Sequence, residues 1–120
     1  MEFYYHEVDK DVLVLGADGG INADNAGRFV ADLETLVDAG LTKIIVDCTS
    51  LEHISSYGIG VLLRLHKRLA RHGGDVKLAG VHTGLATVMR ITRVDQFFDL
   101  YPDVDRARLA FRPRDDMRPA

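Results

Sequence analysis

The sequence predicts an α/β domain with a mixed, mostly parallel sheet of about five strands, an N-terminal β-hairpin and about four helices. Two observations predict this class. Short apolar runs, typical of buried strands, alternate along the chain with longer segments whose apolar residues recur at helical spacing. That alternation is the pattern of parallel crossover units, whose right-handed connections place helices on the faces of a sheet.

The N-terminal segment predicts the hairpin. Aromatic residues at Phe3 and Tyr5 and the apolar run 12–15 flank the polar segment 8–11, which is typical of a turn between two strands. A glycine-containing loop is expected at 17–20, before the first helix.

A helix and a buried strand come next. Asn22 can cap the helix, and Gly40 ends it. Residues 43–48 include three consecutive β-branched side chains, as expected of a central strand that is covered on both faces. The apolar stripe of this first helix consists of Ala26, Phe29, Val30, Leu33 and Val37.

The second helix follows a linking segment at 49–54. Either Ser55 or Ser56 can cap it, and it is expected to run to about His72, where two glycines end it. Its predicted core stripe consists of Ile59, Leu62, Leu63, Leu69 and Ala70.

The C-terminal part continues the alternation. Residues 75–81 resemble another buried strand, Thr83 can cap a short third helix, 96–101 is a candidate last strand, and a fourth helix is expected after Asp103. The third helix carries the apolar residues Leu85, Val88 and Met89.

Composition limits the domain count and the compartment. With 120 residues, of which 47% are hydrophobic and 28% charged, the chain has the make-up of one globular domain. We assign residues 1–111 to it and expect 112–120, rich in Arg, Pro and Asp, to be a flexible tail. The single cysteine, Cys48, excludes an internal disulfide and, with an N-terminus unlike a secretion leader, predicts a cytoplasmic protein.

Charge and hydropathy argue against two classes of partner. A formal net charge of -3 provides no long-range attraction to nucleic-acid phosphates. No apolar run approaches the roughly 18 residues that a membrane span needs. We therefore expect neither a nucleic-acid partner nor membrane insertion.

The segment at 53–63, His-Ile-Ser-Ser-Tyr-Gly-Ile-Gly-Val-Leu-Leu, carries the most chemical information. A hydroxyl at Ser56 would lie where free helix amides and the positive end of the helix dipole converge, so a phosphate there would be held favourably. Gly58 and Gly60 each cost a helix about 1 kcal/mol relative to alanine, and would leave the first turn bare for another protein's approach. Spacing alone does not distinguish this from a simple N-cap.

This segment resembles the STAS domain family, which includes bacterial anti-sigma-factor antagonists and the cytoplasmic ends of sulfate transporters. The usual form in the family is Asp-Ser-Ser/Thr-Gly or a variant with Ser-Ser-Ala-Gly, and the phosphorylated serine stands two residues before the glycine, which is Ser56 here. Ser55 stands where an aspartate is frequent, and Tyr57 where a small residue is usual. The other similar segments are Gly20–Asn22, Ile45–Asp47 and Leu78–Val81.

The resemblance implies a partner switch without enzyme activity or cofactor. The unmodified protein would bind a GHKL-type serine kinase that doubles as an anti-sigma factor, displacing the sigma factor, and phosphorylation of Ser56 would end this binding. A PP2C-type phosphatase would reset the protein. The residues expected to contact the partner are Ser55, Tyr57, Gly58, Gly60, Arg64, Lys67, Asn22 and Asp24.

Basic residues of the second helix have two interpretations. Arg64, Lys67, Arg68 and Arg71 follow its outer face, which is usually just solvated surface. As a functional surface, they would steer an acidic partner toward the serine and raise the association rate more than the affinity. Asn22, one of the expected contact residues, also has a simpler interpretation, because helix capping alone would explain an asparagine at this position.

Other functions stay open or are disfavoured. The main alternative is a non-switching STAS adaptor subunit, for example of a lipid-transporter complex, in which Ser56 is only a cap; weak nucleotide binding and a homodimer also stay open. A hydrolase nucleophile at Ser56 would need Gly-x-Ser-x-Gly, but Ile54 stands at the first position. The five histidines lack metal-site spacing, so no metal is expected, and His66 is expected to be a partly buried structural residue.

Overall fold

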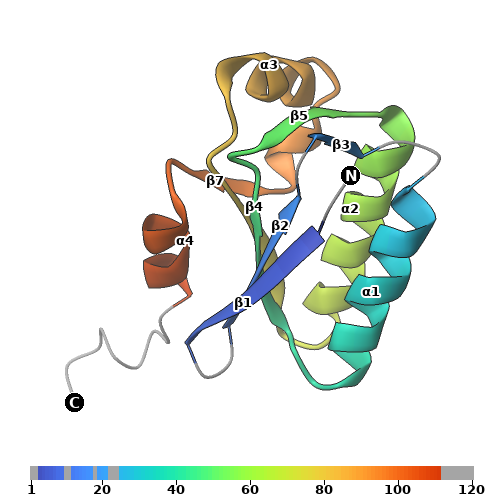
Figure 1. The fold of residues 1–120 in the computed structure, drawn as a ribbon, viewed down its shortest axis with the longest axis vertical. Coiled ribbons are helices and arrows are strands. Elements are labelled where there is room, and N and C mark those ends of the chain that lie inside the picture. Colours follow the sequence, from blue (N-terminus) through green and yellow to red (C-terminus); the bar gives the residue numbers. More distant parts are fainter. Residues whose placement is uncertain (1–2, 10–11, 18, 22–24, 112–120) are drawn as a thin grey trace.

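The computed structural model describes residues 3–9, 12–17, 19–21 and 25–111. A five-stranded sheet in the order β1-β2-β4-β6-β7 forms the centre, with helices α1 and α2 on one face and α4 on the other (Figure 1). Helix α3 lies beyond one end of the sheet (Figure 1). The strands of this sheet are β1 (Phe3–Asp9), β2 (Val12–Ala17), β4 (Lys43–Asp47), β6 (Asp75–Ala79) and β7 (Asp99–Tyr101).

The strand directions confirm the predicted mixed, mostly parallel sheet. Strands β1 and β2 pair antiparallel as the N-terminal hairpin, whereas the β2–β4, β4–β6 and β6–β7 pairs are parallel. The strand β1 extends through Asp9, so the prediction that Val8 and Asp9 belong to the turn is wrong. Antiparallel pairing with β2 accounts for this, because it continues to the Asp9–Val12 pair.

The predicted number of helices, four, is confirmed in the described part of the chain. None of the helices found there is long and apolar enough to cross a bilayer. A single turn of 3-10 helix, η1, separates α3 from β7, where one longer strand was predicted. The bounds are α1 (Ala26–Asp38), α2 (Ser56–Ala70), α3 (Thr83–Ile91), η1 (Val94–Gln96) and α4 (Val104–Ala110).

Strand β4 shows why the apolar run in the middle of the sequence has no polar alternation. Ile44 and Val46 belong to the main core beneath α1 and α2, whereas Ile45 belongs to the smaller core beneath α4. Successive side chains of a strand point to opposite faces, so a strand covered on both sides must be apolar at every position.

Helix α2 packs against both the sheet and α1, which widens its buried surface. Ile59, Leu62 and Leu69 are buried as predicted, but Ala70 is exposed. Val61 and Leu65, which the predicted stripe omitted, are buried as well, and both line the α1–α2 boundary. A helix that contacts two neighbours buries more of its circumference than a helix that contacts one.

A second, two-stranded sheet replaces two segments that were expected to be loops. Strand β3 (Gly19–Ile21) pairs in parallel with β5 (Leu51–Ile54), at the end of the molecule where α2 begins (Figure 1). The His53 imidazole lies over Gly20, so a Cβ atom at position 20 would require this exposed side chain to move. Strand β5 ends at Ile54, two residues before α2 begins.

Two predicted helix caps are wrong. Asn25, not Asn22, immediately precedes α1, and its side chain donates to the Gly20 carbonyl at 2.9 Å instead of capping the helix. His82, not Thr83, caps α3, and Thr83 is the first helical residue. At α1 an Asn does precede the helix, but its side chain bonds to Gly20 instead of to a first-turn amide. At α3 a histidine, which cap preference does not favour, accepts the first-turn N–H.

Candidate functional site

The two serines at the start of α2 have different tasks. Ser55 adopts an extended conformation, with φ -75° and ψ 166°, and its Oγ accepts the N–H of Gly58 at 3.1 Å. This is the geometry of an N-cap, in which a side-chain oxygen satisfies one of the unpaired amides of the first turn. Ser55 is therefore the cap, and the alternative that the sequence left open is resolved.

Ser56 is the first residue of α2 and is exposed. Within the described residues its hydroxyl makes no hydrogen bond, because Ser55 already performs the capping. A group attached to Ser56 would sit beside the positive end of the helix dipole, where negative charge is stabilised. The hydroxyl is thus accessible to a modifying enzyme, and its modification would leave the Ser55 cap in place.

The two glycines of the first turn do not share a face. Each residue of an α-helix is rotated by about 100° from the one before it, so Gly58 and Gly60 point to nearly opposite sides. Gly58 is buried, whereas Gly60 is exposed and a Cβ on it would meet no atom within 4 Å. The prediction that both glycines leave an open surface is correct for Gly60 and wrong for Gly58.

A continuous exposed face runs from Ser56 to the end of the helix. Its members fall within an arc of about 100° around the helix axis, and all of them are exposed. Tyr57, with 55% of its surface accessible, is the large side chain at the serine end. We call this surface the α2 face; it consists of Ser56, Tyr57, Gly60, Arg64, Lys67 and Arg71.

The basic residues of α2 divide into two groups. Arg68 lies beside α1 and forms ion pairs with Glu34 at 3.1 Å and Asp38 at 2.5 Å. Arg64, Lys67 and Arg71, the last being the C-cap residue of the helix, form no ion pair with any residue that the structure describes. Arg68 therefore stabilises the α1–α2 contact. It does not belong to the exposed basic surface that the sequence predicted for this helix.

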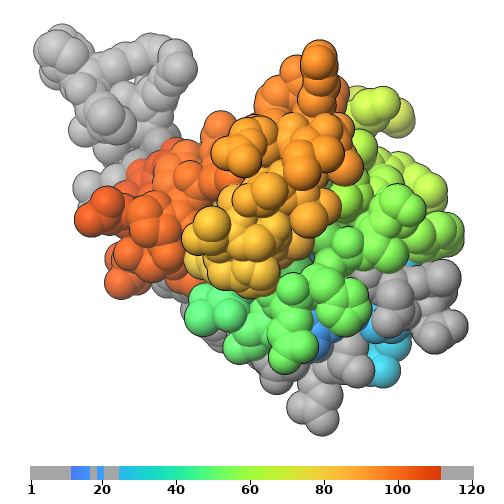
Figure 2. All heavy atoms as spheres, turned by 90° about the horizontal axis from the view of Figure 1, so that it is seen from above, coloured from blue at the N-terminus to red at the C-terminus, as the bar shows by residue number. Residues whose placement is uncertain are grey.

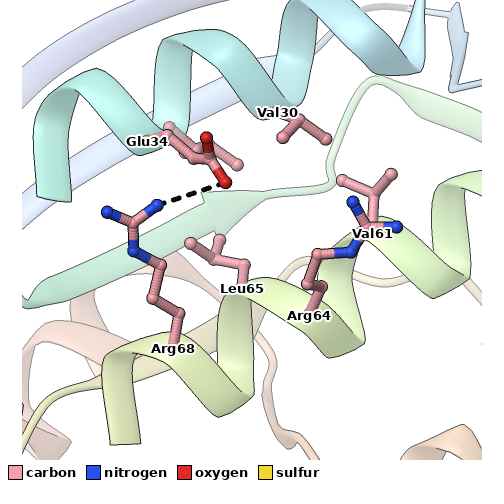
Figure 3. A pocket seen from close by; sticks show the side chains of 7 residues that line it. Val30, Glu34, Val61, Arg64, Leu65 and Arg68 are labelled. Carbon is pink, nitrogen blue, oxygen red and sulfur yellow. Dashed lines mark ion pairs between the residues drawn. The ribbon is translucent and has the colours of Figure 1, made fainter. Parts of the chain in front are cut away.

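A narrow crevice separates α1 from α2 next to this face. Its volume is about 20 Å³, room for roughly one water or methyl group. In Figure 3 the Arg68 side chain points toward Glu34, its ion-pair partner, on one side of the crevice. Arg64 lies near Val61 on the other side. The lining residues are Val30, Leu33, Glu34, Val61, Arg64, Leu65 and Arg68.

Two of the predicted contact residues, Asn22 and Asp24, lie outside the described residues. The other six lie between Ser55 and Lys67, in or immediately before α2, and Gly58 is the one that is buried.

His82 is a structural residue of this region that sequence reasoning missed. Its Nδ1 accepts the N–H of Leu85 at 3.2 Å, and its Nε2 lies 3.2 Å from the carbonyl oxygen of Glu52 in β5. Because Nδ1 is an acceptor here, the ring proton belongs on Nε2, which donates to Glu52. His82 thus ties α3 to the strand that leads into Ser55, and Figure 2 shows α3, in amber, beside the green segment that contains β5. Histidine is not a preferred cap residue, so no sequence signal was available.

The remaining candidate groups have structural roles. Burial and, second, the charge of Asp47 raise the pKa of the Cys48 thiol to about 12, so it stays protonated and unreactive at neutral pH. His66 is half-buried, packs edge-to-face on Phe98 and lies 3.7 Å from Asp75, as expected of a structural histidine. In the part of the chain that the structure describes, no three His, Cys, Asp or Glu residues gather as metal ligands.

Comparison with known proteins decides the family. The model of the STAS domain matches residues 6–107. The chain belongs to the STAS domain family. One relative of this STAS domain is a Bordetella bronchiseptica protein, BtrV, provisionally named an anti-sigma factor antagonist; it is 28% identical over 101 residues, which are 84% of this chain and 87% of BtrV.

Solved structures show that this STAS domain has the fold of anti-sigma factor antagonists. The crystal structure of a Thermotoga maritima protein, provisionally named as one, superposes with a TM-score of 0.85 at 24% identity, over 92% of this chain and 95% of the other. The phosphorylated form of SpoIIAA, a Bacillus cell fate determinant, superposes with a TM-score of 0.74 at 19% identity, over 92% of this chain and 100% of the other. At these identities the likeness concerns the fold.

Proposed function

We propose that this STAS domain is a cytoplasmic anti-sigma factor antagonist that acts by partner switching at Ser56. With Ser56 unmodified, it binds a GHKL-type serine kinase that also serves as the anti-sigma factor, and so releases the sigma factor. Phosphorylation of Ser56 by that kinase ends the binding, and a PP2C-type phosphatase restores it. The observation that carries this proposal is the exposed Ser56 hydroxyl, free of hydrogen bonds to described residues, beside a helix N-terminus that Ser55 caps independently.

The separation of the two serines makes a reversible modification compatible with a stable fold. If Ser56 were the cap, its esterification would remove the acceptor of a first-turn amide and cost about 1 kcal/mol. Ser55 holds that bond instead. The phosphate therefore changes the surface while the helix beneath it keeps its start.

The effect of the phosphate on binding follows from its charge. It adds about -1.5 to -2 charges and three acceptor oxygens at a surface that must lose water when a partner docks. Tyr57, next to it and 55% exposed, is a large amphipathic side chain of the type that anchors interfaces. A kinase seated over Tyr57 and Gly60 would cover Ser56, so an unpaired dianion at that point opposes docking directly.

The names of relatives support the same class of function. BtrV of Bordetella bronchiseptica carries an anti-sigma factor antagonist name. SpoIIAA, an anti-sigma factor antagonist of the same fold, has solved structures in an unphosphorylated and a phosphorylated form.

The proposal is tested with the GHKL-type serine kinase of the organism that supplies this chain. Ser56→Ala should bind the purified kinase as the unmodified protein does, and Ser56→Glu should not bind measurably. Incubation of the unmodified protein with kinase and ATP should add one phosphoryl group to the intact mass. Equal kinase binding by the two variants would contradict the switch and favour the adaptor subunit.

A further inference from the structure

We propose that the cationic end of the α2 face, formed by Arg64, Lys67 and Arg71, is a docking surface for an acidic segment of the protein partner. The identity of that partner rests on the proposed function, but the surface and its chemistry rest on the arrangement of charges along α2.

Charge is segregated onto this helix. The chain as a whole carries a formal charge of -3, yet α2 contains no Asp or Glu between Ser56 and Ala70. Arg64, Lys67 and Arg71 fall within an arc of about 60° and span about 10 Å along the axis, so their charges present one surface. That surface starts about 12 Å from Ser56, on the same side of the helix.

The neighbouring Arg68 provides a comparison, because its charge is neutralised within the protein. Glu34 and Asp38 of α1 hold it in two ion pairs, and its side chain is 32% exposed. Arg64 borders the same crevice, but within the described residues it has no carboxylate partner (Figure 3). Helix α1 therefore compensates one basic residue of α2 and leaves the three on the exposed face for an external acidic group.

The surroundings favour a protein as the source of that acidic group. Tyr57 lies at one end of the face, and the crevice beside Arg64 has apolar walls at Val30, Val61 and Leu65. Aromatic and apolar contacts next to charges are typical of protein interfaces. Three cations on a chain with net negative charge are too few for nucleic-acid or anionic-membrane binding, which depends on many phosphate contacts.

The surface should act mainly on the rate of association. Complementary charges accelerate encounter by factors of about 10 to 1,000 and lose this effect as salt screens them. We expect removal of three charges to lower the association rate of the kinase about tenfold at low salt, with a small change in the dissociation rate.

The first experiment measures association with the kinase by stopped flow at several salt concentrations. The triple variant Arg64→Gln, Lys67→Gln, Arg71→Gln is compared with Arg90→Gln, Arg93→Gln, Arg106→Gln, which removes three exposed cations elsewhere and changes the net charge equally. A tenfold slower, less salt-dependent association of the first variant, with the control unchanged, supports the proposal. Equal slowing of both variants overturns it, because a general charge effect would then suffice.

The second experiment does not depend on Ser56 or the kinase. Amide NMR shifts are recorded while an eight-residue glutamate peptide is added to the unmodified protein and to both triple variants. Shifts confined to the second half of α2, absent in the first variant and retained in the control, support the surface even where no kinase binds. Shifts spread over the molecule, or tighter binding to duplex DNA or phosphatidylserine vesicles than to the peptide, overturn it.

Discussion

Helices α2 and α3 begin in nearly the same way, yet only one of them carries the proposed switch. Their capping residues, Ser55 and His82, have backbone angles of -75°/166° and -75°/164°. Each cap accepts the N–H of the residue three positions later, at 3.1 Å and 3.2 Å. Each helix then starts with an exposed hydroxyl residue, Ser56 in α2 and Thr83 in α3.

The difference lies in what surrounds the hydroxyl. Ser56 adjoins the exposed Tyr57 and heads the α2 face, which carries three cations without ion-pair partners among the described residues. Thr83 is followed by Gly84, and α3 places one exposed basic residue, Arg90, on the same side of the helix. In addition, the capping residue of α3, His82, contacts the carbonyl oxygen of Glu52 through its Nε2. Two of the four described helices thus begin with a hydroxyl residue, and the neighbouring surface makes the one in α2 the candidate switch.

The largest expected effect tests this contrast directly. Ser56→Glu should weaken kinase binding at least about 100-fold, or about 3 kcal/mol, because the new charge lies inside the docking surface. Thr83→Glu places the same charge at an equivalent helix position, and binding should change less than about twofold. Isothermal titration calorimetry measures both. Comparable losses of affinity in the two variants would show that a charge at either helix N-terminus weakens binding, whether or not it lies on the α2 face.

The caps themselves should differ in strength. His82→Ala removes the α3 cap and the bond to Glu52, so it should lower the free energy of unfolding by about 2 kcal/mol. Ser55→Ala removes one cap bond and should cost about 1 kcal/mol. Urea unfolding followed by circular dichroism gives both values. A smaller loss for His82→Ala than for Ser55→Ala would mean that the Glu52 bond contributes nothing.

A substitution at Gly60 should affect the stability of the fold and the affinity for the kinase in opposite directions. Gly60→Ala should raise the free energy of unfolding by about 0.5–1 kcal/mol, because alanine is the better helix former and its Cβ meets no atom within 4 Å. The same methyl group would stand between α2 and a closely docked kinase, so affinity should fall. Thermal unfolding and calorimetry test the two effects; a variant that is more stable and binds unchanged would exclude close backbone approach at Gly60.

The smallest effects are expected at the two first-turn hydroxyls. Ser56→Ala and Thr83→Ala should each change the free energy of unfolding by less than about 0.5 kcal/mol, since neither is the capping residue. Urea unfolding of the two variants provides the measurement. A loss near 1 kcal/mol for Ser56→Ala would show that this hydroxyl shares the capping with Ser55.

Local patterns predicted the parts of the fold that depend on one segment at a time. The buried run of β4, the helical spacing of α1 and the start of α4 after Asp103 are all present in the structure. The β3–β5 pair was missed because each strand is only three or four residues long and is held by a partner about 30 residues away. His82 was missed because histidine is not a preferred cap residue, and its contact with Glu52 lies 30 residues away in the sequence.

The site was predictable to a similar extent. Resemblance to the family identified Ser56, and helical rotation alone would have placed Gly58 on the inner side. The sequence could not show which serine caps the helix, because both can accept a hydrogen bond and only the backbone path out of β5 decides. Nor could it show that Arg68 is neutralised, because Glu34 and Asp38 belong to another helix.

Mapping the phosphate tests the central claim most directly. The unmodified protein is incubated with its GHKL-type kinase and ATP, digested, and the modified peptide is sequenced by mass spectrometry. We predict one phosphate, on Ser56, with Ser55 and Thr83 unmodified. Phosphate on Ser55 or Thr83, or none at all from a kinase that binds the protein, would contradict the account.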